Sequence, residues 1–161
     1  MNRADDNQLV MTQEGLDALK AELHKLRTKT RYEVAERIKV ARGYGDLSEN
    51  SEYDEAKEQQ GFVEGKIAEI EEKVKRAVVV SDEDISTDDV SVGSYVNVLD
   101  MDYDEEVEYK IVGSSESDLL QNKLSNQSPV GMKLLGAKVN DIVKVEIPDG
   151  EAKYKVLSIR R

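Results

Sequence analysis

The chain has 161 residues, a formal net charge of −11, 35% charged residues, and neither Cys nor Trp. This length permits one ordinary domain or two units of about 80 residues each, and it excludes a large multidomain enzyme. Because Cys is missing, disulfides, thiolate nucleophiles and Cys-ligated metals are excluded, which fits a reducing compartment. The chain has a single histidine, His24. Most metalloenzyme sites and Ser-His-Asp triads need at least one well-placed imidazole among other specific partners, so they are disfavoured and any chemistry must come from carboxylates.

The acidic balance argues against sequence-independent binding to duplex DNA, which depends on many Lys and Arg contacts with phosphates. The N-terminal sequence MNRADDNQLV lacks the apolar segment of a signal peptide, and no apolar run is long enough to span a membrane. We therefore expect a soluble, cytoplasmic protein with no membrane partner.

The composition changes near Ala77, which divides the chain into two differently built parts. Residues 1–77 carry 14 basic and 17 acidic side chains, whereas residues 78–161 carry 9 and 17. Apolar residues follow a helical period in the first part and cluster in short alternating runs in the second. The sequence predicts an α+β protein with a helical arm over 1–77, a small α+β domain over 78–161, and a boundary at 77–81.

Two long amphipathic helices are predicted in the arm. The first begins with Thr12 as its N-cap and is ended by Gly43 and Gly45, and its apolar spacing loosens in the second half. The second carries an apolar stripe over 53–77, flanked by Gly61 and Gly65, where we expect the helices to approach closely. A short connection makes the pair an antiparallel coiled-coil hairpin about 45 Å long.

The second part reads as a small mixed domain. Its last two strands form a hairpin whose turn is Pro148-Asp149-Gly150. One short helix is expected over 130–135, and the acidic, polar segment 81–91 is expected to be a mobile linker or long loop. Strands are predicted at 77–80, 94–99, 105–112, 142–147 and 153–159.

The connection between the helices carries the sharpest chemical feature, the carboxylates of Asp46 and Glu49. Mg²⁺ is usually held by one or two carboxylates with waters and phosphates, so this pair could complete the coordination of an ion already held by a partner. Alternatively, the two residues form a capping box that opens the second helix. Spacing alone favours the capping box, and both interpretations can hold for different atoms.

Charge on the arm is uneven near this connection. Residues 25–42 contain seven basic and two acidic side chains, whereas residues 46–58 contain six acidic residues and one Lys. One hypothesis makes Arg37, Arg42 and Lys57 a phosphate-facing patch that steers a nucleic-acid strand. The other hypothesis is ion pairing across the hairpin, because antiparallel helices bring the two segments opposite each other. The sequence does not decide between them.

With these residues in view, the chain resembles the bacterial Gre transcript-cleavage factors, most closely the GreA type. The resemblance rests on the runs GDLSENSEY over 45–53 and EQQGFVEGKI over 58–67, and on Ser128-Pro129 leading into a Leu-Leu-Gly segment. It implies an FKBP-like second domain that docks on RNA polymerase, and a hairpin that enters the polymerase secondary channel.

The resemblance also assigns roles to residues. Asp46 and Glu49 would assist a Mg²⁺ ion shared with RNA polymerase and the attacking water, and Arg42 and Lys57 would face the 3′ end of backtracked RNA. Ser128 and Pro129 loosely match the polymerase-docking loop. The implied function is rescue of arrested polymerase by an accessory factor that is not an enzyme, with no tightly bound cofactor and no small-molecule substrate.

Three other functions compete with this one. Prolyl isomerisation is excluded, because residues 78–161 contain no Phe or Trp to line a proline pocket. A channel-blocking inhibitor without cleavage activity remains an alternative, although the intact run of tip acids argues against it. A hairpin chaperone or scaffold is the third. The basic patch is thinner than in the GreB type, so weak action on long backtracked RNA is expected.

Overall fold

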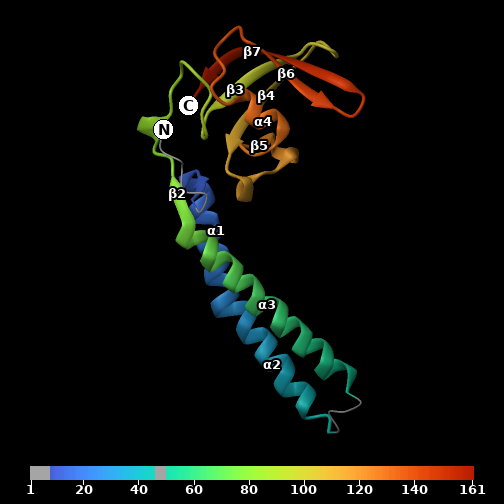
Figure 1. Cartoon of the computed structure of the whole chain (residues 1–161). Helices are drawn as coiled ribbons and strands as arrows, with labels where there is room; N and C mark the ends of the chain where they lie inside the picture. The colour runs from blue at the N-terminus through green and yellow to red at the C-terminus, as the bar shows by residue number, and fades with distance from the viewer. Residues whose placement is uncertain (1–7, 46–49) are drawn as a thin grey trace. The chain divides into compact units, whose positions relative to one another are not determined.

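The structure, a computed structural model, describes residues 8–45 and 50–161. They fall into two units, a helical one over Asp17–Arg76 and a β-rich one formed by Ala77–Arg161 together with the described residues before Asp17 (Figure 1). The predicted α+β class is confirmed. The sequence assigned all of 1–77 to the arm, whereas the structure groups the residues before Asp17 with the second unit. Every helix in the described ranges is too short or too polar to cross a membrane.

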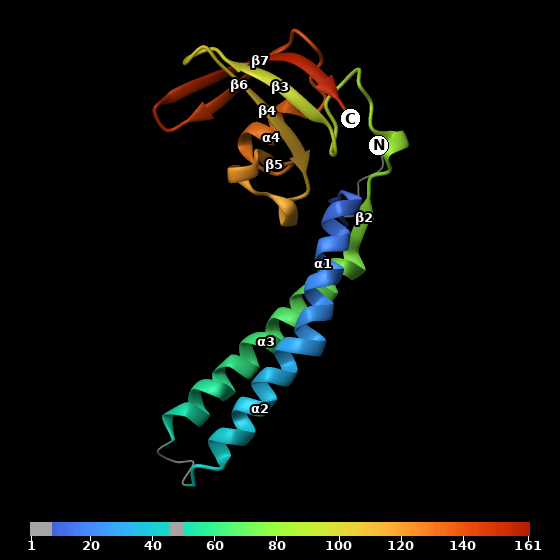
Figure 2. The ribbon, with the colours of Figure 1, turned by 180° about the vertical axis from the view of Figure 1, so that it is seen from behind.

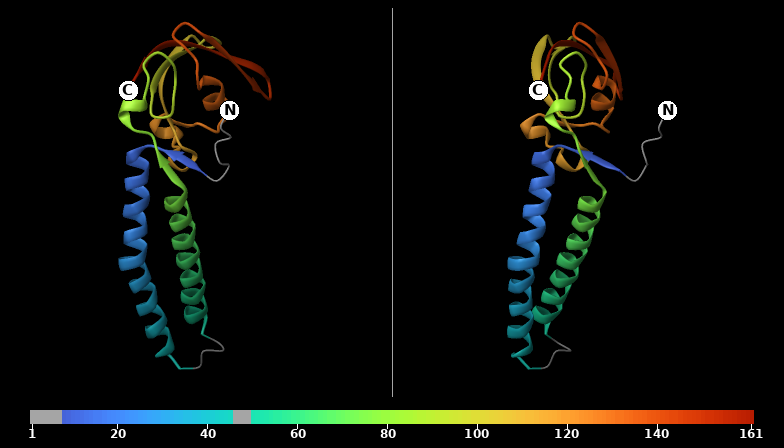
Figure 3. Two further views of the ribbon diagram at one scale, coloured as in Figure 1. Left: turned by 60° about the vertical axis from the view of Figure 1, so that its left-hand side comes forward. Right: turned by 90° about the vertical axis from the view of Figure 1, so that its left-hand side faces the viewer.

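The helical unit is an antiparallel pair of long helices. One line of helix consists of α1 (Gln13–Lys25), a π-helical segment (Leu26–Thr30) and α2 (Arg31–Arg42), and α3 (Ser51–Arg76) runs back beside it (Figure 3). The side chains buried along their contact are Val34, Ile38 and Ala41 of α2 and Ala56, Val63, Ile67 and Ile70 of α3. This seam follows the predicted apolar stripes.

The π-helical segment explains why the apolar spacing of the first helix loosens. The backbone N–H of Arg31 bonds to the Leu26 carbonyl, five residues earlier, instead of four. The hydroxyl of Thr28 also donates to the His24 carbonyl at 2.7 Å. This wider turn takes up extra residues, so apolar side chains at intervals of four stay on the face that meets α3.

The glycines of α3 differ from the expectation of close helix approach. A Cβ atom built at Gly61 or at Gly65 would meet nothing within 4 Å. Both positions are exposed, so neither glycine is needed for packing against α2. Exposed Phe62, with 73% of its surface accessible, lies between them in the sequence.

The start of α1 is fixed by several hydrogen bonds within the β-rich unit. Thr12 is the N-cap, as predicted, because its hydroxyl accepts from the Gly15 N–H at 3.1 Å. Just before it, β1 (Leu9–Met11) pairs in parallel with β2 (Ala77–Val79). The sequence predicted β2 from its run of valines, but not β1, which contains a single β-branched residue, Val10.

The larger sheet has five strands in the order β5-β4-β3-β7-β6 (Figure 2). All neighbours are antiparallel except β4 and β5. The predicted bounds of β4 and β6 agree with the structure, whereas β7 is longer than predicted and β5 was not predicted. The strands are β3 (Tyr95–Asp100), β4 (Glu105–Val112), β5 (Lys123–Ser125), β6 (Ile142–Ile147) and β7 (Gly150–Arg160).

The core of this unit lies between one face of the sheet and the short helix α4 (Pro129–Leu134). Val96, Val98 and Val156 of the sheet are fully buried, as is Leu134 of α4. Gly136 ends the helix region with a φ of +81°, a conformation that glycine adopts without strain.

Of the two expectations for 81–91, a mobile linker or a long loop, the structure shows a long loop with one short 3₁₀ turn at Asp82–Asp84. Ile85 and Val90 are buried, although acidic and polar residues surround them in the sequence. The Val90 N–H donates to the Ala137 carbonyl at 2.9 Å, and the Gly136 N–H donates to the Val90 carbonyl at 2.8 Å. Two apolar anchors and these backbone bonds therefore hold the segment against the core.

Candidate functional site at the turn of the helical hairpin

The two predicted catalytic residues, Asp46 and Glu49, lie outside the described residues, and the structure describes the chain on either side of them. On the first side, α2 closes through bonds from the Gly43 N–H to the Val40 carbonyl at 3.0 Å and from the Tyr44 N–H to the Ala41 carbonyl at 3.2 Å. The predicted end of the first helix at Gly43 is therefore confirmed.

On the second side, α3 begins at Ser51 and its N-cap is Asn50. The Asn50 side-chain oxygen accepts from the Tyr53 N–H at 3.1 Å, and the Asn50 carbonyl accepts from the Asp54 N–H at 3.1 Å. These bonds define an N-cap and its N3 residue. The residues of the alternative capping box, 46–49, lie outside the described residues, and within the described residues Asn50 caps this helix.

Asn50 was missed by sequence reasoning, although a signal for it was present. Asn is among the residues most favoured at the N-cap, and Ser51 follows it directly before the apolar stripe of α3. The more familiar pattern of an acid followed three residues later by Glu drew the prediction to an earlier position.

The basic side chains of the arm are engaged in part across the hairpin. Arg27 of the π-helical segment pairs with Glu71 at 2.6 Å. Arg31 forms two hydrogen bonds with Glu64, at 2.8 and 2.9 Å, and this contact raises the pKa of the Arg31 guanidinium. Both pairs cross the hairpin, but their acids lie on α3 beyond the segment 46–58 that the pairing hypothesis placed opposite these cations.

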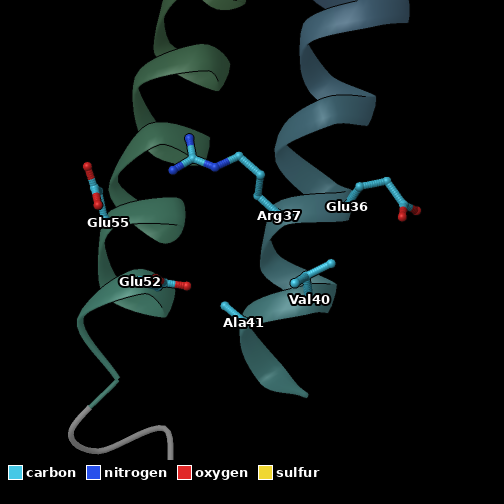
Figure 4. Close-up of a pocket in the computed structure, with 6 residues that line it drawn as sticks. All are labelled: Glu36, Arg37, Val40, Ala41, Glu52 and Glu55. Atoms are coloured by element: carbon cyan, nitrogen blue, oxygen red, sulfur yellow. The ribbon is translucent and has the colours of Figure 1, made fainter. Parts of the chain in front are cut away.

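The three residues predicted to bind nucleic acid, Arg37, Arg42 and Lys57, are all exposed. Arg37 extends from α2 toward α3 and donates to the side-chain oxygen of Gln59 (Figure 4). Lys57 donates to Gln60 within its own helix at 3.0 Å. Arg42 follows Arg37 by five residues, which turns it by about 140° around the axis of α2. Arg37 therefore lies on a different side of the helix.

A groove of about 410 Å³ lies beside Arg37, between the last turns of α2 and the first turns of α3. Arg37 and Glu52 point into the space between the helices, whereas Glu36 and Glu55 point away from it (Figure 4). Val40 and Ala41 are the apolar residues that line it. Among the residues that line the groove, one cation and one carboxylate therefore face its space, and this balance gives a phosphate no net attraction there.

Ser128 and Pro129 lie in the other unit, at the start of α4. The Ser128 hydroxyl accepts from the Gly131 N–H at 3.1 Å and donates to the Ser125 carbonyl at 2.7 Å, so Ser128 is the N-cap. Pro129 occupies the first helical turn, where its missing N–H costs no hydrogen bond, and its side chain is exposed. Ser128 thus has a structural role, and Pro129 presents its ring to solvent.

Comparisons with known proteins agree with this architecture over nearly the whole chain. Residues 9–79 match the family described as "Transcription elongation factor, N-terminal", and residues 85–161 match "Transcription elongation factor, GreA/GreB, C-term". The chain belongs to the GreA/GreB family of transcription elongation factors. The family match divides the chain where the helical hairpin gives way to the β-rich unit.

Individual members of the GreA/GreB family are similar over almost their full length. A transcription elongation factor GreA from Acetivibrio thermocellus is 56% identical over 158 residues, which cover 98% of this chain and 99% of that protein. One from Clostridium perfringens strain SM101 is 58% identical over 152 residues, covering 94% and 96%. The solved structure of GreA factor homolog 1 of Thermus thermophilus is 25% identical in sequence, with a TM-score of 0.44. The match covers 96% of this chain and 99% of that chain.

Proposed function

We propose that this elongation factor rescues backtracked RNA polymerase by stimulating transcript cleavage in the polymerase's own active centre. The hairpin enters the secondary channel, and Asp46 and Glu49 complete the coordination of a Mg²⁺ ion that the polymerase also holds. Water then attacks the phosphodiester phosphorus and the 3′ oxygen leaves, which restores a 3′ hydroxyl on the retained RNA. Membership of an elongation-factor family makes the chain an accessory of RNA polymerase and not an enzyme in its own right.

The cap of α3 is the observation that carries this proposal. Asn50 provides the hydrogen bond that the start of α3 requires, so the helix does not need Asp46 or Glu49 as a cap. A carboxylate with no capping role is available to bind a metal ion. Two carboxylates alone bind Mg²⁺ weakly, which supports an ion shared with a partner over a site of the chain's own.

The length of the arm supports the same function. The helical line from Gln13 to Arg42 spans about 45 Å at 1.5 Å per residue, with buried apolar side chains at intervals from Leu19 to Ala41. Two packed helices are narrow enough to enter a channel, and their length suits a group that must act at the end of one. Exposed Arg42 and Lys57 are proposed to contact phosphates of the backtracked RNA, with Arg37 in a lesser role.

The β-rich unit is proposed to dock at the rim of the channel through the start of α4. Pro129 offers a rigid apolar ring to a partner, and Ser128 fixes the direction of the chain there through its two hydrogen bonds. Substitution of Pro129 should therefore weaken binding to polymerase, and substitution of Ser128 should also disturb α4.

The test is Mg²⁺-dependent cleavage of a defined stalled transcription complex. The double variant Asp46→Ala, Glu49→Ala should lose stimulation and still bind polymerase, whereas Glu72→Gln, an exposed acid far from the turn, should behave like the wild type. Full stimulation by the double variant would overturn the proposal. If the wild-type protein slows ordinary elongation and does not stimulate cleavage, the inhibitor alternative is correct.

A further inference from the structure

The two helix ends at the turn have backbone groups that their own helices leave without partners. The last carbonyls of α2 lack N–H donors from a following turn, and the first N–H groups of α3 lack carbonyl acceptors from a preceding one. The side chain of Asn50 forms a hydrogen bond with each of the two helix ends. Its Nδ2 donates to the Ala41 carbonyl at 2.6 Å, and its Oδ1 accepts from the Tyr53 N–H at 3.1 Å.

The chemistry of the contacts fixes the orientation of the Asn50 amide. A backbone N–H can only donate and a carbonyl can only accept, so Oδ1 must face Tyr53 and Nδ2 must face Ala41. The Ala41 carbonyl also accepts from the Tyr44 N–H at 3.2 Å, and its two lone pairs accommodate both donors. The side chain is partly buried, which shields these bonds from competing water.

Few other side chains could form this bridge between helices. Asp and Ser can cap α3, but Asp has no donor for the Ala41 carbonyl, and the Ser side chain is one atom shorter, so a hydroxyl that caps the Tyr53 N–H reaches less far toward that carbonyl. Gln has the right groups on a longer and more mobile chain. Asn at position 50 is therefore required by the bond to the Ala41 carbonyl, in addition to the bond that caps α3.

We propose that Asn50 is a positioning residue for cleavage: it ties the end of α2 to the start of α3 and so fixes the ends of the segment that carries Asp46 and Glu49. The inference rests on the proposed function, since it explains how the acids reach a reproducible place. Ala41 and Asn50 are nine positions apart, and without the bridge the spacing between these ends would fluctuate. Displacement of a catalytic group by about 1 Å can reduce a rate by about 10²-fold.

The deciding variant is Asn50→Ser, which keeps a good N-cap and removes the bond to Ala41. At saturating protein, the cleavage rate of the stalled complex should fall about 10- to 100-fold, while affinity for polymerase stays within about twofold of the wild type. The Mg²⁺ concentration for half-maximal cleavage should also rise. A purely structural role would instead lower affinity and helix content together.

Two further variants separate the bridge from the cap. Asn50→Asp retains the cap and lacks the donor, so it should match Asn50→Ser in rate. Asn50→Ala loses both bonds and should show additional loss of protection from hydrogen exchange at the Tyr53 amide. In the wild-type protein, the side-chain NH₂ of Asn50 should exchange slowly with solvent, because one of its hydrogens is bonded to Ala41.

The outcomes distinguish this inference from the function on which it rests. If Asn50→Ser cleaves at the wild-type rate and the double acid variant does not, the positioning role is overturned and the function stands. If both variants cleave normally, the function fails and the inference fails with it. Rapid exchange of the wild-type Asn50 amide would overturn the bridge whatever the cleavage rates.

Discussion

The backbone N–H of Thr12 donates a hydrogen bond to the Glu116 carboxylate at 2.9 Å, across 104 positions of sequence. The Thr12 hydroxyl donates to the same carboxylate, as does the Gly113 N–H at 3.1 Å. A carboxylate from a loop of the β-rich unit thus sits at the N-terminus of α1, where the helix macrodipole favours negative charge. The backbone N–H and the hydroxyl of Thr12 both donate to this carboxylate. The oxygen of the same hydroxyl accepts from the Gly15 N–H and so caps α1.

Replacement of Glu116 by Ala should destabilise the β-rich unit. The N–H groups of Thr12 and Gly113 would lose a charged acceptor in a partly buried site, at a cost of about 1–3 kcal/mol. Urea unfolding should show a lower midpoint for Glu116→Ala and an intermediate one for Glu116→Gln. Glu105→Ala, at an exposed position on the sheet, should leave the midpoint nearly unchanged; equal effects at both positions would contradict this account.

Replacing glycine by alanine should lower stability in α1 and raise it in α3. A Cβ at Gly15 would lie 2.1 Å from the Glu116 carboxyl carbon, so Gly15→Ala must displace that side chain and lower stability. Gly61→Ala and Gly65→Ala meet open space in a helix interior, and each should raise the stability of the hairpin by up to about 1 kcal/mol. Thermal unfolding of the three variants, monitored by helical circular dichroism, checks both signs.

Alkaline pH should destabilise the β-rich unit through Tyr109 and Tyr154. Burial raises the pKa of both phenols above the ordinary value of 10, and the nearby Asp100 carboxylate raises each pKa further. The unfolded chain therefore releases these protons at lower pH than the folded chain. Their stabilisation is complete below about pH 10 and is lost as the pH rises through the higher pKa values of the folded protein.

Urea unfolding at a series of pH values from 9 upward would measure this loss. The variant Tyr154→Phe should flatten the decline in unfolding free energy, and Tyr103→Phe should not, because Tyr103 is 77% exposed. Absorbance of the tyrosinates should show two classes of phenol in the native protein. A single class titrating near pH 10 would contradict the prediction.

Substitution of Arg42 and Lys57 should weaken contact with RNA phosphates. Each contact to a single strand contributes about 0.7 to the slope of log affinity against log salt, so Arg42→Gln or Lys57→Gln should each reduce that slope by about this amount. Affinity for stalled complexes with long backtracked RNA, measured at several salt concentrations, provides the test. Lys29→Gln, an exposed cation far from the turn, is the matched control.

Periodicity and capping rules predicted much of the fold from sequence. Thr12, Gly43 and the Pro148-Asp149-Gly150 turn were found because each has a local physical signature that the structure confirms. The three-residue strands β1 and β5 were missed because their stability comes from partners distant in sequence. The anchors of segment 81–91 were hidden by an acidic composition that is typical of linkers.

The candidate site was predictable only in part. The acids Asp46 and Glu49 were singled out from charge and position and stay predictions. The bridge made by Asn50 could not be derived, because it depends on the Ala41 carbonyl coming within reach of a residue nine positions later. Likewise, helical periodicity could have separated Arg37 from Arg42, but the contact of Arg37 with Gln59 depends on the register of the two helices.

The parallel pairing of β1 with β2 has a consequence for how the hairpin could come apart. The chain enters α1 directly from β1 and leaves α3 directly into β2. The two strands pair from Leu9 opposite Ala77 to Met11 opposite Val79, so backbone hydrogen bonds join the two chain segments at that end of the hairpin. At the opposite end Asn50 joins the helices. Helices normally fray from their termini. Here, separation of the helices from one end must first break the β1–β2 pairing, and from the other end the bond between Asn50 and Ala41. Melting is therefore expected to start in the interior, at the wide turn formed by Leu26–Thr30.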